Sequence, residues 1–223
     1  MKPYVICHMY ISIDGKIDGA YMDESGCDIS GAFYDDVIFE MGSSMAGGRV
    51  TSQLYKAKGK NVLDNFENEV VPEGDFIIPA KHYQFCFDRM GKCFYDDPWY
   101  CYGGEKMQIV EVVSSACDKR YLAYLRKMQI AYMIADSVQE ALEKMYSKWN
   151  VERLVLTGGA IINGGFFKEN CIDEISLVVA PYVEGNNIYK QFVGDMNIFM
   201  NQKYLFYKAN PLADGGVQLI FKK

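Results

Sequence analysis

Short apolar runs alternate with segments of helical period along most of the chain. Residues 4–13, "YVICHMYISI", are almost continuously apolar and end at the turn residues Asp14-Gly15, which predicts a β-strand. The same reasoning predicts strands at residues 107–115, 130–135, 153–157 and 174–183. The last twenty residues predict a hairpin around Asp214-Gly215-Gly216.

Helical periodicity fills three of the intervals. Phe33, Val37, Met41 and Met45 recur every four residues and predict a helix over 33–45, after a polar loop at 20–31. A second helix is expected at 118–128. A third begins after the capping box formed by Ser137 and Glu140.

The pattern of residues 76–104 predicts a pair of antiparallel strands. The apolar runs 83–88 and 93–95 are separated by the turn-like "RMGK". We therefore expect an inserted segment at about 76–104, rich in aromatic residues, that serves as a lid or an interface.

Strands alternate with helices from 107 to 183, which favours a mainly parallel α/β sheet with helices on its faces and a C-terminal antiparallel hairpin. No internal repeat or low-complexity linker interrupts the chain. A single domain over 1–223 is the expectation.

Composition and charge narrow the classes of function. Half of the 223 residues are hydrophobic, and the net charge of −6 gives no general attraction to nucleic acid or anionic lipid. The seven cysteines include no C-x-x-C pair, the N-terminus does not resemble a signal peptide, and no apolar run approaches membrane-spanning length. We expect a soluble cytoplasmic protein with reduced cysteines.

The strand at 153–157 runs into Gly158-Gly159, although glycine is costly inside regular structure. A strand that turns through glycine into a helix exposes backbone N–H groups at the helix N-terminus, and these groups bind phosphate. Ligands of open α/β sheets lie at this carboxyl edge. A tight structural turn is the alternative of equal weight.

Three further strand ends carry side chains suited to a ligand. In "GGRVTS", 47–52, Arg49 offers a fixed cation and Thr51 and Ser52 offer hydroxyl groups, which suits a 2′-phosphate. Ser114-Ser115 follow the strand at 107–113. Ser12, Asp14 and Lys16 follow the first strand and could bind a polar heterocycle, or form a simple Asp-Gly turn.

Other chemistries are disfavoured. The sequence lacks G-x-G-x-x-G, P-loop, H-E-x-x-H and G-x-S-x-G motifs, and His8 is expected to be a packed core residue. His82, Cys86, Cys93 and Cys101 could be drawn as a zinc site, but their spacings fit no common ligand pattern. No metal site is predicted.

Four segments occur in an order that resembles the dihydrofolate reductase superfamily, and more closely the reductase domain of the bifunctional riboflavin-biosynthesis proteins. They are "PYVICHMYISIDGKI", "GGRVT", "VEVVSS" and "LVLTGGAIINGGFFKENCIDEISLVVAPYVEG". The resemblance covers essentially the whole chain. It implies a dihydrofolate reductase-like fold with a mixed, mainly parallel sheet, NADPH as hydride donor, a small-molecule substrate and a homodimer.

The resemblance also implies roles for individual residues. Gly158 and Gly159 would meet the cofactor diphosphate, with Thr157, Ala160, Ile161, Ile162 and Asn163 beside it. Gly48, Arg49 and Thr51 match the G-R-x-T element that holds the cofactor phosphates. Ser114 would lie near the adenosine, and Ser12 and Asp14 beside the nicotinamide and substrate, where Asp14 is the best candidate for catalysis.

Departures from the family concern the substrate. Thr157 stands where riboflavin-pathway reductases carry an acidic residue, "GGRVTSQLY" replaces their ribose-phosphate element, and "SGCDISG" lacks their tryptophan. Asp35 or Asp36 matches the pterin-binding carboxylate of dihydrofolate reductases only loosely. The main hypothesis is an NADPH-dependent reductase of a small polar heterocycle or carbonyl compound. The alternatives are the riboflavin-pathway 5-amino-6-(5-phosphoribosylamino)uracil reductase and a nucleotide-binding protein without catalysis.

Overall fold

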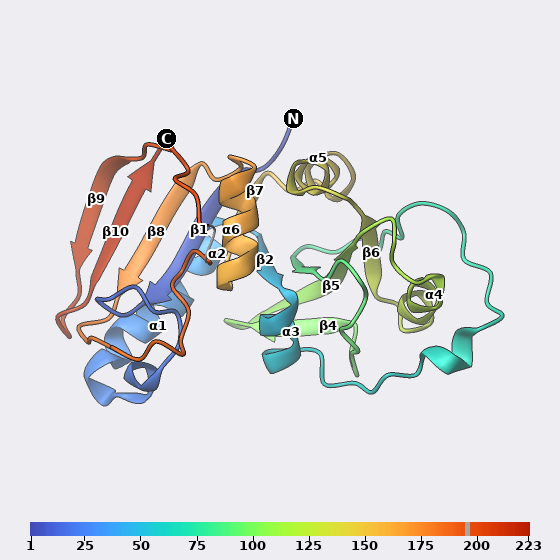
Figure 1. The fold of residues 1–223 in the computed structure, drawn as a ribbon, viewed down its shortest axis with the longest axis horizontal. Helices are drawn as coiled ribbons and strands as arrows, with labels where there is room; N and C mark the ends of the chain where they lie inside the picture. The colour runs from blue at the N-terminus through green and yellow to red at the C-terminus, as the bar shows by residue number, and fades with distance from the viewer. Residues whose placement is uncertain (195–196) are drawn as a thin grey trace. The chain divides into compact units, whose positions relative to one another are not determined.

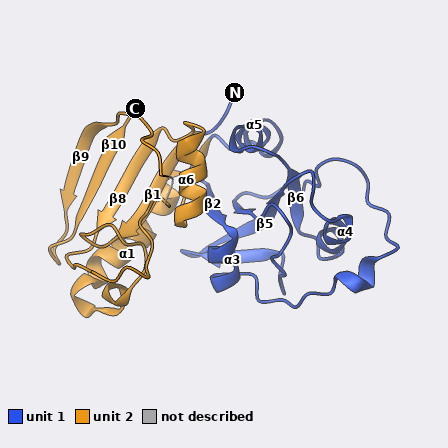
Figure 2. Cartoon of the chain, viewed as in Figure 1, with its two compact units in different colours: residues 1–3, 43–152 blue, residues 4–42, 153–223 orange. Residues whose placement is uncertain are grey.

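The computed structural model describes residues 1–194 and 197–223, which form two compact units (Figure 2). Unit 1 comprises residues 1–3 and 43–152, and unit 2 comprises residues 4–42 and 153–223. The two units are described separately, and the expectation of one domain stays a prediction.

Unit 2 contains five paired strands in the order β7-β1-β8-β10-β9 (Figure 1). β1 pairs in parallel with β7 and β8, and β10 pairs antiparallel with β8 and β9. Its strands are β1 (Tyr4–Ile11), β7 (Arg153–Leu156), β8 (Glu174–Val179), β9 (Leu205–Pro211) and β10 (Val217–Lys222). Its helices are η1 (Ala20–Asp23), η2 (Ser25–Cys27), α1 (Asp28–Asp36), α2 (Ile38–Met41) and α6 (Ala160–Lys168).

A buried polar chain crosses the strands of unit 2. His8 is fully buried, and its ring nitrogens contact Ser176 Oγ at 2.9 Å and the Tyr34 carbonyl at 3.0 Å. Gln218 donates to the same Ser176 hydroxyl, and Asn210 donates to Gln218. Burial lowers the pKa of His8 to about 4, so the ring is neutral at pH 7. The prediction that His8 is a packed core residue is confirmed.

The strands of unit 1 are also mainly parallel. β3 lies between β2 and β5 and is parallel to both. β5 also pairs with two further strands, antiparallel with β4 through its first residues and parallel with β6 through its last. Its strands are β2 (Ser44–Gly48), β3 (Tyr83–Phe87), β4 (Trp99–Tyr102), β5 (Glu105–Val113) and β6 (Ala131–Ile134). Its helices are α3 (Arg49–Tyr55), η3 (Leu63–Phe66), α4 (Lys119–Lys127) and α5 (Val138–Trp149).

The predicted fold class is confirmed, because parallel strands predominate in both units and the chain ends in an antiparallel hairpin. None of the helices in the described part of the chain is long and apolar enough to cross a membrane.

Three local predictions are wrong. The polar loop expected at 20–31 contains η1, η2 and the start of α1. The helix expected over 33–45 stops at Met41, because Gly42 is extended and the chain continues as β2, which buries Met45. The antiparallel pairing of 83–88 with 93–95 is replaced by parallel pairing of β3 with β2 and β5. Residues 93–95 form no strand and fold over the sheet, where Cys93, Phe94 and Tyr95 join the core.

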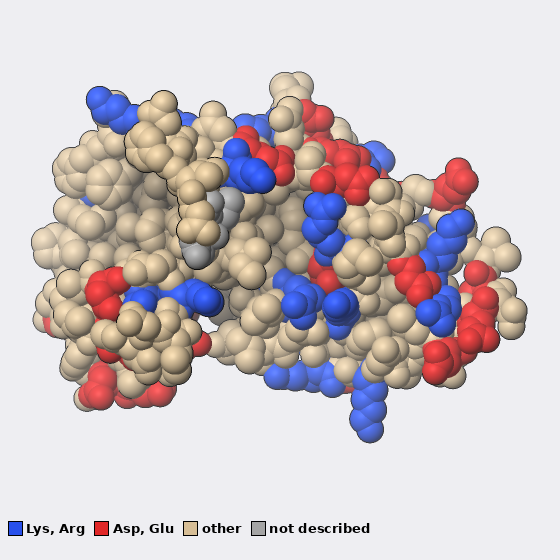
Figure 3. Space-filling model, viewed as in Figure 1, with Lys and Arg blue, Asp and Glu red and all other residues tan. Residues whose placement is uncertain are grey.

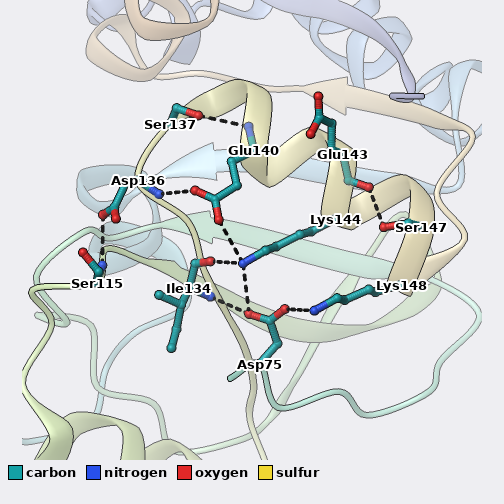
Figure 4. Close-up of polar contacts among 10 residues, drawn as sticks. All are labelled: Asp75, Ser115, Ile134, Asp136, Ser137, Glu140, Glu143, Lys144, Ser147 and Lys148. Carbon is teal, nitrogen blue, oxygen red and sulfur yellow. Dashed lines mark hydrogen bonds and ion pairs between the residues drawn. The ribbon is translucent and has the colours of Figure 1, made fainter. Parts of the chain in front are cut away.

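The loop before β3 is tied to α5 by Asp75 (Figure 4). The Asp75 carboxylate, 3% exposed, accepts from Ile134 N at 2.9 Å and lies 2.6 Å from Lys148 Nζ and 3.6 Å from Lys144 Nζ. Lys144 also contacts Glu140 at 3.1 Å. A carboxylate this buried needs its cations, because desolvation penalises an unpaired charge.

Replacing Asp75 with Asn keeps an acceptor for Ile134 N and removes the charge that both lysines face. We expect the free energy of unfolding to fall by about 1–3 kcal/mol, measured by urea denaturation. Asp64→Asn is the control, because its carboxylate is 98% exposed and 3.9 Å from Arg120. The control should change stability by less than about 0.5 kcal/mol. Equal effects of the two substitutions would contradict the role of Asp75.

Candidate active site

The turn after β7 requires glycine at its first position. Gly158 has a φ of +85°, and its peptide bond to Gly159 is cis. A Cβ at Gly158 would lie 2.8 Å from Met9 Cε on β1. The positive φ therefore favours glycine here, and a side chain would also require the end of the Met9 side chain to move. The glycine pair satisfies a structural need, and it also leaves the backbone at the carboxyl edge of β7 uncovered by side-chain atoms of its own.

α6 begins directly after this turn. Its N-cap is Gly159, which has no side chain to satisfy the first N–H groups of the helix. Ile161 is 83% exposed in the first turn, and Ala160 is buried. The positive end of the helix dipole therefore lies beside the exposed residue Ile161, and this arrangement favours the binding of an anion.

Asn163 holds this helix in place. Its side chain is fully buried and donates through Nδ2 to the Phe192 carbonyl at 2.7 Å and to Met9 Sδ at 3.3 Å. These contacts engage the amide nitrogen with the protein itself. Its Oδ1 atom is buried and has no hydrogen-bond partner within residues 1–194 and 197–223.

Ser12 and Asp14 follow β1 and are directly bonded to each other. Ser12 Oγ donates to Asp14 Oδ1 at 2.7 Å, and the carboxylate accepts from Glu184 N at 2.9 Å and Gly185 N at 3.0 Å. The bond from Ser12 and these backbone donors lower the pKa of Asp14 to about 2. Asp14 is therefore a carboxylate at neutral pH that fixes the loop after β8, and it is poorly suited to donate a proton.

In unit 1, Gly48 ends β2 and Arg49 begins α3. Arg49 Nη1 donates to Gln53 Oε1 at 2.7 Å, so the side chain is oriented by a neutral group that does not offset its charge. Thr51, two residues after Arg49, is partly exposed, whereas Ser52 is fully buried.

The segment from Arg49 to Lys60 carries four cationic residues and no acidic one, against a net charge of −6 for the chain. Figure 3 shows lysine and arginine side chains gathered over α3 and the segment that follows it. An anionic ligand would meet a local positive potential here.

Ser114 lies on the same edge of the unit 1 sheet, since β2, β3 and β5 are parallel and Gly48, Phe87 and Val112 align in register. Its hydroxyl donates to the Arg89 carbonyl at 2.8 Å, and its own N–H donates to the same carbonyl. The next residue, Ser115, donates its N–H to Asp136 at 3.0 Å (Figure 4). The side chain of Ser114 thus fixes the loop after β3.

The predicted residues fall into one set in each unit. In unit 2 the set comprises Ser12, Asp14, Thr157, Gly158, Gly159, Ala160, Ile161, Ile162 and Asn163, at the ends of β1 and β7 and the start of α6. In unit 1 it comprises Gly48, Arg49, Thr51 and Ser114, at the ends of β2 and β5. Their ligand contacts stay predictions.

Sequence reasoning missed a buried group in unit 1. Cys86, Cys93 and Glu111 place their ligand atoms within 4.8 Å of one another. Two of its members, Cys86 and Cys93, were considered with His82 and Cys101 and set aside because of their spacing. Glu111 lies in a different strand, and only the register of β3 with β5 brings it opposite Cys86.

Parallel strands that end in a glycine turn or a cationic turn, each followed by a helix, are typical of α/β proteins that bind phosphate-bearing ligands. Residues 3–203 match the family model of the RibD C-terminal domain. The chain belongs to this family, which confirms the riboflavin-reductase branch of the predicted resemblance.

Solved structures share the fold at low sequence identity. A pyrimidine reductase-like protein of Corynebacterium diphtheriae has a TM-score of 0.70 and 10% identity, with 99% of this chain and 91% of that chain covered. RibD of Acinetobacter baumannii gives 0.66 and 15%, and the riboflavin biosynthesis reductase Rib7 of Saccharomyces cerevisiae gives 0.62 and 11%. In both matches 99% of this chain is covered, against 58% of the Acinetobacter chain and 90% of the yeast chain. No curated protein matches the chain at a significant level.

The lowered pKa of Asp14 predicts a pH-dependent contribution to stability. The folded pKa of about 2 lies below the ordinary value of 3.8, so the contribution is complete above about pH 4 and is lost as pH falls toward 2. Asp14→Asn should therefore lower the unfolding midpoint in urea at pH 7, with a smaller deficit at pH 3. The exposed Asp23, replaced by Asn, is the control. An Asp14→Asn deficit that stays constant from pH 7 to pH 3 would refute this assignment.

Proposed function

We propose that this chain is an NADPH-dependent reductase that transfers a hydride to a small polar heterocyclic substrate. Membership in the RibD C-terminal domain family carries the proposal. The family resemblance also leads us to propose a homodimer located in the cytoplasm.

Each unit carries residues that suit a phosphate-bearing part of a dinucleotide. In unit 2, Gly158 lacks a side chain at a strand end where close backbone approach is required, and the N-terminus of α6 follows it. Thr157, Gly159, Ala160, Ile161 and Ile162 would accompany it at the diphosphate. In unit 1, Arg49 and Thr51 would bind the 2′-phosphate that distinguishes NADPH from NADH.

The cofactor supplies the hydride when bound, and the chain supplies positioning and charge. Ser12 and Asp14 would act beside the substrate as a bonded pair. Because Asp14 is held ionised, its contribution would be to orient the Ser12 hydroxyl and to favour positive charge developing on the substrate, with the proton delivered by water.

The substrate we favour is a ribosylated aminouracil of riboflavin biosynthesis. One structural neighbour, from Thermotoga maritima, is described as a deaminase and 5-amino-6-(5-phosphoribosylamino)uracil reductase, and Rib7 as a riboflavin biosynthesis reductase. The sequence differs from riboflavin reductases at Thr157 and in "GGRVTSQLY", which points to altered contacts with the ribose phosphate.

Titration with NADPH and NADH, followed by nicotinamide fluorescence, tests the cofactor. Arg49→Ala should weaken NADPH binding about tenfold or more, since a hydrogen bond between charged groups contributes about 1.5–3 kcal/mol. NADH, which lacks the 2′-phosphate, should bind the variant and the wild type equally.

Arg120→Ala is the matched control, because Arg120 is also partly exposed but is paired with Asp118 at 2.7 Å. Its NADPH affinity should equal that of the wild type. Failure of the wild-type protein to bind either nucleotide would leave Gly158-Gly159 as a structural turn and refute the reductase proposal.

The substrate is tested by supplying the 5-amino-6-(5-phosphoribosylamino)uracil substrate with NADPH and following cofactor oxidation. A parallel assay asks whether the gene restores growth without riboflavin to a reductase-deficient strain. Turnover and growth are expected. Tight NADPH binding with neither turnover nor growth would exclude this substrate, and further failure across a panel of heterocycles would favour a non-catalytic nucleotide-binding protein.

A further inference from the structure

Unit 1 contains a cluster of metal-binding side chains outside the predicted cofactor residues. Cys86 lies on β3, Glu111 on β5, and Cys93 on the segment that folds back over the sheet. All three are buried, with relative exposures of 1%, 0% and 0% for Cys86, Cys93 and Glu111. Their ligand atoms lie within 4.8 Å of one another.

The sheet itself brings two of the three together. Cys86 and Glu111 are register partners in adjacent parallel strands, so their side chains leave the same face. On the other side of Cys86 its partner in β2 is Gly47, which adds no side chain to that face. The space over this part of the sheet is therefore free for Cys93.

The spacing of the sulfur atoms fits a tetrahedral metal. Cys86 Sγ and Cys93 Sγ are 3.9 Å apart. Two Zn–S bonds of about 2.3 Å at a tetrahedral angle separate the sulfurs by about 3.8 Å. The separation is almost twice the S–S length of a disulfide, about 2.05 Å.

Two buried oxygen atoms at the cluster are incompletely satisfied. Glu111 Oε1 accepts from the Tyr95 hydroxyl, whereas Glu111 Oε2 has no hydrogen-bond partner in the described residues. The Ser52 hydroxyl, on α3, is fully buried and likewise has no hydrogen-bond partner among the described residues. Buried polar atoms without partners are rare, and an absent ion is one of their recognised causes.

We propose that Cys86, Cys93 and Glu111 bind a structural Zn²⁺ ion, with Ser52 as the candidate for the fourth ligand. Thiolate and carboxylate are both established zinc ligands, and a site closed to solvent is typical of structural zinc.

The surroundings provide the support that metal ligands require. The Tyr95 hydroxyl orients Glu111, and Asp88 accepts from Cys93 N at 2.7 Å. The Tyr121 hydroxyl donates to the Cys93 carbonyl at 2.6 Å. Hydrogen bonds to the ligand residues fix the ligand geometry in metal sites.

A metal ion would also offset much of the charge of its ligands. Two thiolates and one carboxylate carry three negative charges, and Zn²⁺ offsets two of them. A buried group of three acids without such compensation would be strongly unfavourable if ionised.

The site would act on α3. Cys93 Sγ lies 3.8 Å from the Arg49 carbonyl, and Ser52 belongs to the same helix. A bound ion would therefore fix the first turn of α3, and with it Arg49, to β3 and β5. This inference does not depend on the proposed reductase activity.

The test begins with the full-length wild-type protein, purified anaerobically with a thiol reductant and without a metal-affinity tag. Mass spectrometry should find about one equivalent of zinc per chain. After exchange, Co²⁺ should give intense sulfur-to-cobalt charge-transfer absorption. X-ray absorption of the zinc protein should give two sulfur atoms at about 2.3 Å and lighter ligands at about 2.0–2.2 Å.

Variants assign the ligands. Cys93→Ser and Glu111→Gln should each lose metal affinity by at least about tenfold, with circular dichroism confirming that they fold. Cys117→Ser, at a buried cysteine outside the cluster, and Cys101→Ser, at the exposed one, should keep the wild-type zinc content.

Three results would overturn the proposal. The first is wild-type protein that retains neither Zn²⁺ nor Co²⁺ after desalting. The second is zinc that is retained equally by Cys93→Ser. The third is a Cys86–Cys93 disulfide, seen as the loss of two hydrogen atoms in the intact mass of the anaerobically purified protein. The wild-type measurements decide the matter even if both ligand variants fail to fold.

Discussion

Parallel pairing of buried strands is the constraint on which both units depend. Parallel strands satisfy their backbone groups only with a neighbour on each side, and they need a crossover to return to the same edge. In unit 2 this applies to β1 between β7 and β8, and in unit 1 to β3 between β2 and β5. The consequence is that the turns after β1 and β7, and those after β2 and β5, lie at the carboxyl edges of their sheets. In each unit, residues that are distant in sequence are therefore brought to the same edge by strand pairing.

Features that do not depend on strand pairing could be predicted from the sequence. β5, α5 and the capping of α5 by Ser137, which accepts from Glu140 N at 3.0 Å, depend on residues within one segment. The glycine turn after β7 is equally local, because a positive φ leaves few alternatives to glycine. These features were predictable because neighbouring residues alone decide them.

Features that depend on strand order were not predictable. The apolar pattern of β3, "YQFCF", does not indicate which strands are its neighbours. β3 is a central parallel strand because β2 and β5 lie on either side of it. The helical period that includes Met45 is interrupted by Gly42, yet periodicity alone continues across it. The proximity of Glu111 to Cys86 follows from register, and no spacing along the chain encodes it. The sequence therefore indicated the candidate cofactor residues, which are local motifs, and it drew Cys86 and Cys93 together without showing that Glu111 lies beside them.

The candidate residues also differ in what their existing bonds permit. Asp14 and Ser114 are engaged by backbone partners, so their first role is to hold the loops after β8 and β3 in place. Arg49 is oriented by a neutral amide, which does not offset its charge. Glu111 Oε2 is buried with no partner among the described residues, at a position where water cannot easily supply one. Ligands are attracted to polar groups whose bonding is incomplete. By that criterion the strongest demand for an external ligand in unit 1 comes from Arg49 at its surface and from Glu111 in its core, and α3 links the two.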